Sequence, residues 1–217
     1  MFAGHLAVAL GAKAAEPKVP LAGLVAASFG VDLIWPLLLL AGVEIVRVAP
    51  GITAFTPLAF EHYPWSHSLV MTVVWGAIAG ALAFVFLKSV RSAIVIGAVV
   101  ISHWVLDLVT HRPDLPISLS GPKVGLGLWN SIPGTLILEG GLLVVAVVLY
   151  VRSAKPLDAV GRWALWGLVA LTGTIWVTQP WSPPPPSSTA VAVVSLAMWL
   201  FPFWAFWIER HRPSAAS

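Results

Sequence analysis

Ser102-His103-Trp104-Val105-Leu106-Asp107-Leu108-Val109-Thr110-His111 closes an apolar run that begins near residue 92. Three side chains in this stretch can bind a metal, and they are spaced i, i+4 and i+8: His103, Asp107 and His111. On an α-helix this spacing places them along one stripe about 12 Å long. Ionisable groups are costly in a helix that spans a membrane, so they mark a functional site there. The stretch therefore predicts a spanning helix that carries a polar site.

The composition of the chain is that of an integral membrane protein. Of its 217 residues, 59% are hydrophobic and 10% are charged, whereas about a quarter of the residues of a soluble domain are charged. The absence of cysteine excludes disulfides and thiolate metal ligands. The net charge of +3 calls for no nucleic-acid partner, because the basic residues lie in short connections between apolar runs. The expected partner is membrane lipid.

Six apolar runs are long enough, or nearly so, to cross a hydrocarbon core of about 30 Å. They cover residues 21–43, 66–87, 92–110, 132–151, 163–180 and 189–208, and a shorter apolar run covers residues 2–15. We therefore predict an all-α integral membrane protein with about six transmembrane helices and a short N-terminal half-helix. Residues 1–208 would form a single transmembrane domain and residues 209–217 a polar C-terminal tail.

The distribution of lysine and arginine over the connections predicts the orientation in the membrane. One side carries nine of them: Lys13, Lys18, Lys88, Arg91, Arg152, Lys155, Arg162, Arg210 and Arg212. The other side carries three: Arg47, Arg112 and Lys123. The first side is expected to be cytoplasmic, together with both termini, and the loops 44–65, 111–131 and 180–188 to lie outside. We expect a multi-pass protein of the cell (inner) membrane.

With this orientation, ionisable side chains of separate helices point at the outer half of the bundle, and the site should face the extracytoplasmic side. The predicted metal ligands are His67, His103 and Asp107, completed by His5 and Asp32. His62 and His111 would be rim ligands or proton carriers in catalysis. Imidazole and carboxylate ligands suit a divalent metal, with zinc as the first candidate and manganese or iron as alternatives. The alternative for the stripe from His103 is a polar seam that holds helices together.

The position of His5 depends on the turn at residues 16–20. If the helices on either side of this turn form a hairpin, His5 and Asp32 reach similar depths, because each is about equally far from Lys18. A His–Asp pair at that depth would orient the imidazole and fix its tautomer. The alternative is an N-terminal helix that lies along the cytoplasmic surface and leaves His5 in water.

The segment Glu61-His62-Tyr63-Pro64-Trp65-Ser66-His67-Ser68 precedes the second predicted span. Its two histidines are five residues apart, one in the loop and one on the first helical turn, so they could converge on one ion. The alternative is two interfacial histidines without a metal. Ser66 has the side chain of an N-cap and is predicted to cap the span.

Another helix start lies at Asn130-Ser131, with Pro133 in the first turn. The free N–H groups of such a terminus favour an anion such as a phosphate or a carboxylate, so Asn130 and Ser131 are the predicted substrate-binding residues. The alternative is ordinary helix capping. Glu139, two turns into this helix, is predicted to be a metal ligand or a general base.

At these residues the chain resembles the YdjM-like family of predicted membrane-bound, metal-dependent hydrolases. The family's hallmarks look like Gly4-His5, Val31-Asp32, the segment from His62 to Ser68, and His103-x-x-x-Asp107, which together cover roughly residues 1–115. Tyr63 and Pro64 replace the family's Arg-Gly, and Asp32 alone stands for its Pro-Asp-x-Asp. A fainter similarity relates the His-x-x-x-Asp helix to zinc-dependent phospholipases C. The resemblance implies a metal site and a hydrolytic reaction.

The sequence thus predicts a membrane-embedded, metal-dependent hydrolase of a lipid or lipid-linked (phospho)ester near the outer leaflet. The alternative is a transporter that passes metal ions or protons through the same side chains, which would need a polar route into the cytoplasmic half. A third possibility is a structural or partner-binding membrane protein, in which alanine at His103 or Asp107 would leave metal content and phenotype unchanged.

Overall fold

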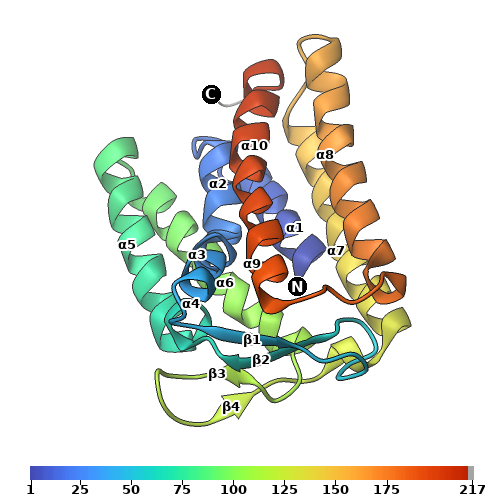
Figure 1. The fold of residues 1–217 in the computed structure, drawn as a ribbon. Coiled ribbons are helices and arrows are strands. Elements are labelled where there is room, and N and C mark those ends of the chain that lie inside the picture. Colours follow the sequence, from blue (N-terminus) through green and yellow to red (C-terminus); the bar gives the residue numbers. More distant parts are fainter. Residues whose placement is uncertain (215–217) are drawn as a thin grey trace.

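The computed structural model describes residues 1–214 as a bundle of helices with two small antiparallel sheets at one end (Figure 1). The helices are α1 (Phe2–Ala15), α2 (Leu21–Ser28), α3 (Gly30–Leu40), α4 (Pro64–His67), α5 (Leu69–Leu87), α6 (Val90–Thr110), α7 (Ile132–Ser153), α8 (Ala159–Thr178), α9 (Ser188–Ser195) and α10 (Leu200–His211). Short 3-10 turns cover Leu128–Asn130, Gln179–Trp181 and Leu196–Trp199. The strands are β1 (Ile45–Val48), β2 (Leu58–His62), β3 (Leu115–Pro116) and β4 (Lys123–Val124).

The helices confirm an all-α, multi-pass membrane protein. Within the described residues, five helical segments are long and apolar enough to cross a membrane: Leu69–Leu87, Val90–Thr110, Ile132–Ser153, Ala159–Trp181 and Ser188–His211. The pair α2 and α3 passes the same test only together, and this bent pair forms either a broken sixth span or a re-entrant loop. Helix α1 is apolar but short, as expected for a half-helix.

The first span is broken, which the sequence did not predict. Helices α2 and α3 are bent by 51° at Phe29, whose φ of −95° and ψ of 4° depart from helical values, and Gly30 follows it. The last carbonyls of a helix have no partner within that helix. The break therefore leaves the carbonyl of Ser28, the final residue of α2, available to another side chain.

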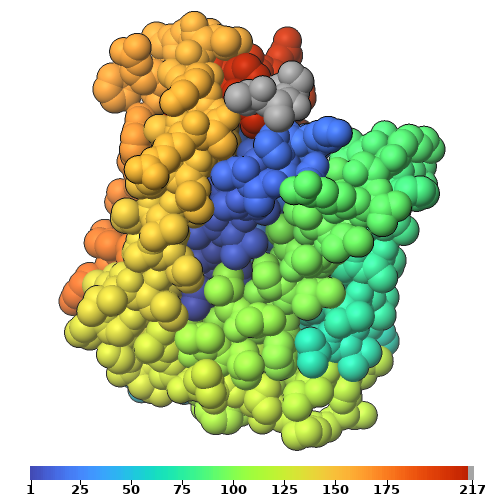
Figure 2. All heavy atoms as spheres, turned by 180° about the vertical axis from the view of Figure 1, so that it is seen from behind, coloured from blue at the N-terminus to red at the C-terminus, as the bar shows by residue number. Residues whose placement is uncertain are grey.

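Helix α1 lies inside the bundle. It packs between α6 and α7, and the view from behind shows its blue residues between the yellow α7 and the green α6 (Figure 2). Leu6 and Leu10 are fully buried. The turn after α1 is held by the Lys13 ammonium, which donates to the carbonyls of Pro17 and Val19. The hairpin of α1 and α2 is thus formed, and a surface helix with His5 in water is excluded.

The two ends of the chain lie at different levels of the bundle. The described C-terminal end lies where α1 ends, whereas the N-terminal end lies in the interior (Figure 1), and the amino group of Met1 contacts Asp107. Residues 209–211, predicted to begin the polar tail, continue α10, and Glu209 accepts hydrogen bonds from Lys13 and from the backbone of Leu21. Residues 215–217 of the predicted tail lie outside the described residues.

The loops at the other end contain strands that the sequence did not reveal. β1 pairs antiparallel with β2, with Val46 opposite Phe60, and β3 pairs with β4. The predicted capping of α7 by Ser131 is confirmed, because its Oγ accepts the N–H of Gly134. The predicted capping by Ser66 is wrong: Ser66 lies in the separate helix α4, and Ser68 caps α5 by accepting the N–H of Met71.

Candidate metal centre

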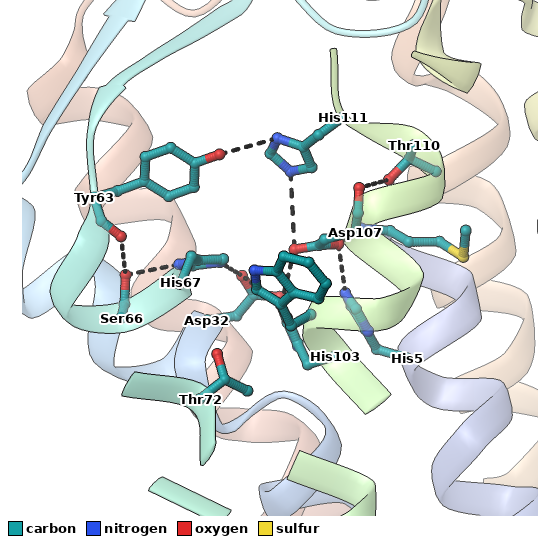
Figure 3. A network of polar contacts seen from close by, with 12 residues as sticks. His5, Asp32, Tyr63, Ser66, His67, Thr72, His103, Asp107, Thr110 and His111 are labelled. Carbon is teal, nitrogen blue, oxygen red and sulfur yellow. Dashed lines mark hydrogen bonds and ion pairs between the residues drawn. The ribbon is translucent and has the colours of Figure 1, made fainter. Parts of the chain in front are cut away.

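The polar side chains of four helices meet near the end of the bundle that carries the sheets (Figure 3). Ligand atoms of His5, His103 and Asp107 all lie within 4.8 Å of one another, and so do those of Asp32, His67 and His103. These two groups, which share His103, contain all five predicted metal ligands. We call these five side chains the His/Asp cluster.

Asp107 is the carboxylate with the most neighbours in the His/Asp cluster. Its Oδ1 lies 3.3 Å from His5 Nε2 and contacts the amino group of Met1. Its Oδ2 lies 3.2 Å from His103 Nε2 and 3.8 Å from His111 Nε2. The stripe predicted from the i, i+4 and i+8 spacing therefore does point to one place.

The second carboxylate, Asp32, faces two other imidazoles. Its Oδ1 lies 3.3 Å from His67 Nε2 and 3.8 Å from His103 Nε2. The predicted pair of His5 with Asp32 is replaced by a pair of His5 with Asp107, and the His5 ring stacks on the His103 ring with centroids 3.6 Å apart. The reason is that α1 packs against α6, which brings His5 to the helix that carries Asp107.

The tautomer of His103 follows from the break between α2 and α3. Its Nδ1 lies 2.8 Å from the carbonyl oxygen of Ser28. A carbonyl oxygen can only accept a hydrogen bond, so Nδ1 carries the proton. In the neutral ring, Nε2 then has a lone pair, and this lone pair faces both Asp32 and Asp107.

The tautomer of His67 is set by a chain of two hydrogen bonds. Ser66 Oγ lies 2.6 Å from Glu44 Oε2 and donates to it, and the Ser66 N–H donates to Glu44 Oε1 at 2.9 Å. Since the hydroxyl proton is used on Glu44, Ser66 Oγ accepts from His67 Nδ1, 2.6 Å away. The lone pair of His67 is therefore on Nε2, which faces Asp32. Glu44 is itself buried.

His111, which ends α6, is oriented in the same way. Its Nδ1 lies 3.0 Å from Asp114 Oδ1, which accepts its proton, and 3.2 Å from the Tyr63 hydroxyl. Arg112 holds the other oxygen of Asp114 at 2.9 Å. Burial lowers the pKa of His111, with Asp114 acting in the opposite direction, and burial raises the pKa of Tyr63.

In their neutral form, the imidazoles of His67, His103 and His111 turn Nε2 lone pairs towards the two carboxylates. Among residues 1–214, His103 Nε2 and both ring nitrogens of His5 are buried with no hydrogen-bond partner. A lone pair that faces a carboxylate is repelled by it unless a proton on the ring or a cation lies between them. Histidines that bind metals hold their other ring N–H on a carbonyl, a carboxylate or another oxygen, which is the arrangement of His67, His103 and His111.

The separations within the His/Asp cluster fit a metal ion. Two ligand atoms on a tetrahedral zinc ion, each at about 2.0–2.1 Å, are about 3.3 Å apart. The nitrogen–oxygen distances from His5 to Asp107, from His67 to Asp32 and from His103 to Asp107 are 3.3, 3.3 and 3.2 Å. The buried His and Asp side chains could therefore hold a metal ion with little rearrangement.

The cluster opens towards the surroundings at one carboxylate. The side chain of Asp32 is 21% exposed, whereas those of His67 and Asp107 are 4% and 3% exposed. The other two members, His5 and His103, are also buried. Asp32 is therefore the most accessible side chain of the cluster.

The remaining predicted site residues lie apart from the two metal-binding groups. The carboxylate of Glu139 accepts the N–H groups of Ala3 and Gly4 at 2.9 and 3.2 Å, so it caps the start of α1. His62 is exposed on β2, opposite Ile45. Asn130 and Ser131 are exposed, and Ser131 serves as an ordinary N-cap.

Four neighbours of the cluster were missed as functional residues or interpreted differently: Glu44, Tyr63, Ser66 and Asp114. Two of them carry a local signal, since Ser66 directly precedes His67 and Asp114 is three residues from His111. Glu44 and Tyr63 have no such local signal in the sequence, because they contact residues 22 and 48 positions away. A buried acid at the end of a span is the one feature that could have drawn attention to Glu44.

We expect Glu44→Gln to weaken metal binding 10- to 100-fold, the usual cost of losing a group that orients a ligand. The amide cannot accept at both oxygen positions, so Ser66 is free to turn and His67 loses its fixed tautomer. A chelator competition titration of the purified protein measures the affinity. Glu61→Gln is the matched control, because Glu61 is exposed and pairs only with the exposed Arg47. Equal affinities for both variants would contradict the orienting role of Glu44.

Comparisons with protein-family models, with curated proteins and with solved structures find no match to this chain. The similarity to the YdjM-like hydrolases therefore rests on the short motifs alone. Those motifs contain the five residues that the fold brings together: His5, Asp32, His67, His103 and Asp107.

Proposed function

We propose that this protein is a membrane-embedded, metal-dependent hydrolase of a lipid or lipid-linked (phospho)ester. The proposal depends mainly on how three histidines are oriented. The Nδ1 proton of His67, His103 and His111 is held by an oxygen in each case. Their Nε2 atoms face the carboxylates of Asp32 and Asp107. The Met1 ammonium already contacts Asp107 Oδ1, so a metal ion would lie where Asp32, His67 and His103 converge or would displace that ammonium. A structural seam would hydrogen-bond its members to one another. Such a bond joins His67 Nε2 to Asp32 Oδ1 at 3.3 Å, whereas His103 Nε2 and both nitrogens of His5 have no such partner among residues 1–214.

Zinc is the metal that this set of side chains fits first, with manganese and iron as alternatives. When bound, such an ion would act as a Lewis acid and would lower the pKa of water towards neutral. His5, His67 and His103 would hold the ion through nitrogen, and Asp32 and Asp107 through oxygen. Asp114 holds the Nδ1 proton of His111 and thereby fixes the direction in which its Nε2 points. Asp32 lies at the opening, next to the approaching ester.

The orientation belongs to the same proposal. The end of the bundle with the sheets carries the connections with few basic residues, so it faces the extracytoplasmic side of the inner membrane. The described C-terminal end and the turn after α1 are then cytoplasmic. The His/Asp cluster lies in the outer half, where an ester bond near a lipid headgroup is within reach.

The transporter alternative gains no support from the residues beneath the cluster. The far end of the bundle has a second polar group, in which Lys13 pairs with Glu209. In the part of the chain that the structure describes, the buried side chains between these two levels include Leu6, Leu10 and Val99, all apolar. An ion crossing the bundle would have to pass through this apolar layer.

The experiment that tests the proposal is elemental analysis of the purified protein, wild type beside His103→Ala. We expect a stoichiometric divalent metal in the wild type and its loss in the variant, because His103 belongs to both metal-binding groups. His62→Ala is the matched control and should keep the metal, since His62 is exposed.

Turnover of phospholipids by the metal-loaded protein, compared with metal flux in liposomes, then separates hydrolase from transporter. Wild-type protein that hydrolyses phospholipid while free of metal would overturn the proposal. So would a metal content that His103→Ala leaves unchanged.

A further inference from the structure

An apolar groove runs along the outside of the bundle between α2–α3 and α5. Its volume is about 400 Å³ and its floor is formed by Ile96 and Val100 of α6. The walls are Val19, Pro20, Gly23, Ala26, Ala27, Gly30 and Ile34 on one side and Trp75, Ile78, Ala79, Leu82, Ala83, Phe86 and Leu87 on the other. Every lining side chain is apolar apart from the Trp75 indole N–H, which donates to the carbonyl of Trp65.

The length of the groove matches one leaflet of a membrane. On α5 it extends from Leu87 to Trp75, which at 1.5 Å per residue is about 18 Å. Half of a hydrocarbon core of about 30 Å is about 15 Å. Because the walls belong to membrane-spanning segments, the groove faces hydrocarbon, and a single extended acyl chain has the shape and length to fill it.

Two lysines are next in sequence to residues that line one end of the groove, which we call its mouth. Val19 and Leu87 line it at the end where α5 finishes and α2 begins (Figure 1), and the next residue to each is a lysine, Lys18 and Lys88. Both lysines are exposed. Across residues 1–214 neither of them forms an ion pair, whereas their neighbours Glu16 and Glu209 are paired with Arg91 and Lys13.

The backbone at the mouth supports a role for the Lys88 side chain. Lys88 ends α5 with φ of +52°, and it is the one residue other than glycine with positive φ in the described part of the chain. Glycine is the residue that ordinarily takes this position. On the other side of the mouth, the buried Lys13 holds the turn that presents Lys18.

We propose that the groove is a binding site for an anionic glycerophospholipid, with its phosphate between Lys18 and Lys88 and one acyl chain along α5. Two lysines near a membrane surface attract an anionic headgroup, and the apolar walls take the chain. The site lies at the opposite end from the sheets, and its occupation does not depend on the proposed hydrolysis. Its inner end reaches Val100, three residues before His103 on α6, so a bound lipid would also support the helix that carries the His/Asp cluster.

The test is a native mass spectrometry titration of protein kept free of metal by a chelator, so that hydrolysis does not contribute. Phosphatidylglycerol and phosphatidylcholine with identical acyl chains are the probes. We expect the first phosphatidylglycerol to bind roughly 30-fold more tightly than phosphatidylcholine, the preference that two lysines provide at a membrane surface. Lys18→Gln combined with Lys88→Gln should abolish this preference. Arg152→Gln combined with Lys155→Gln removes two charges from the same end outside the groove and should preserve it.

The groove itself is tested by Gly23→Phe, which places a ring among the lining residues. It should remove the first tight site for both lipids, whereas Gly141→Phe, on an exposed face of α7, should not. If Gly23→Phe does not fold, Ala83→Phe fills the groove from the opposite wall. If neither variant folds, the lipid preference of the Lys18→Gln, Lys88→Gln double variant tests the proposal. Equal binding of the two lipids by the wild type, a preference that survives loss of both lysines, or tight binding to a folded protein with a filled groove would each overturn the proposal.

Discussion

Asp107→Asn is expected to lower the affinity for metal at least about 100-fold, so that the variant is metal-free under conditions that saturate the wild type. Loss of a group that only orients a metal ligand already lowers metal affinity 10- to 100-fold, and Asp107 is a proposed ligand itself. Asp107 is the carboxylate that faces His5, His103 and His111. Asparagine has nearly the same shape, but the substitution also leaves the buried Met1 ammonium without its partner. Thermal denaturation therefore has to show that the variant is folded before metal contents are compared. Chelator competition and elemental analysis measure the affinity, and phospholipid turnover should fall to background together with the metal.

The control for Asp107→Asn is Asp158→Asn. Asp158 is exposed, caps α8 through the N–H of Gly161 and contacts His211, far along the bundle from the His/Asp cluster. This variant should bind metal and turn over substrate as the wild type does. If Asp107→Asn kept its metal with wild-type affinity, the cation would lie elsewhere and the proposed centre would be wrong.

Two substitutions at Glu139 are expected to differ sharply. Its carboxylate accepts the N–H groups of Ala3 and Gly4, and each hydrogen bond to a charged group contributes about 1.5–3 kcal/mol. Glu139→Leu should therefore lower the free energy of unfolding by about 3 kcal/mol and loosen the start of α1. Because His5 lies one residue after Gly4, metal affinity should fall as well. Glu139→Gln keeps an acceptor oxygen and should stay close to the wild type in both properties.

Thermal denaturation and chelator competition on the two Glu139 variants measure these effects. The comparison also separates the two roles considered for this residue, since a general base must be able to take up a proton and glutamine cannot. A Glu139→Gln variant that binds metal normally but has lost turnover would show that Glu139 is the base. Normal turnover would show that it acts by holding α1.

The sequence by itself determined the membrane bundle and the residues of the candidate centre. Apolar length is a local property, so the predicted spans agree with α5 to α10 to within a few residues. The spacing of His103, Asp107 and His111 is also local, because one helix fixes their relative directions. The depth of His67 and Asp32 followed from their places in the spans and from the direction of each crossing.

The tertiary structure alone decided how these side chains meet and what holds them. The proton on His103 depends on the carbonyl of Ser28, 75 residues away, and on a bend that no local pattern marks. The partner of His5 is Asp107 instead of Asp32, because α1 enters between α6 and α7. Glu139, predicted from the sequence to be a metal ligand or a general base, caps a helix 135 residues earlier in the chain. Hydropathy and periodicity describe each helix separately, whereas these contacts depend on which helices become neighbours, and that is settled only when their surfaces pack together.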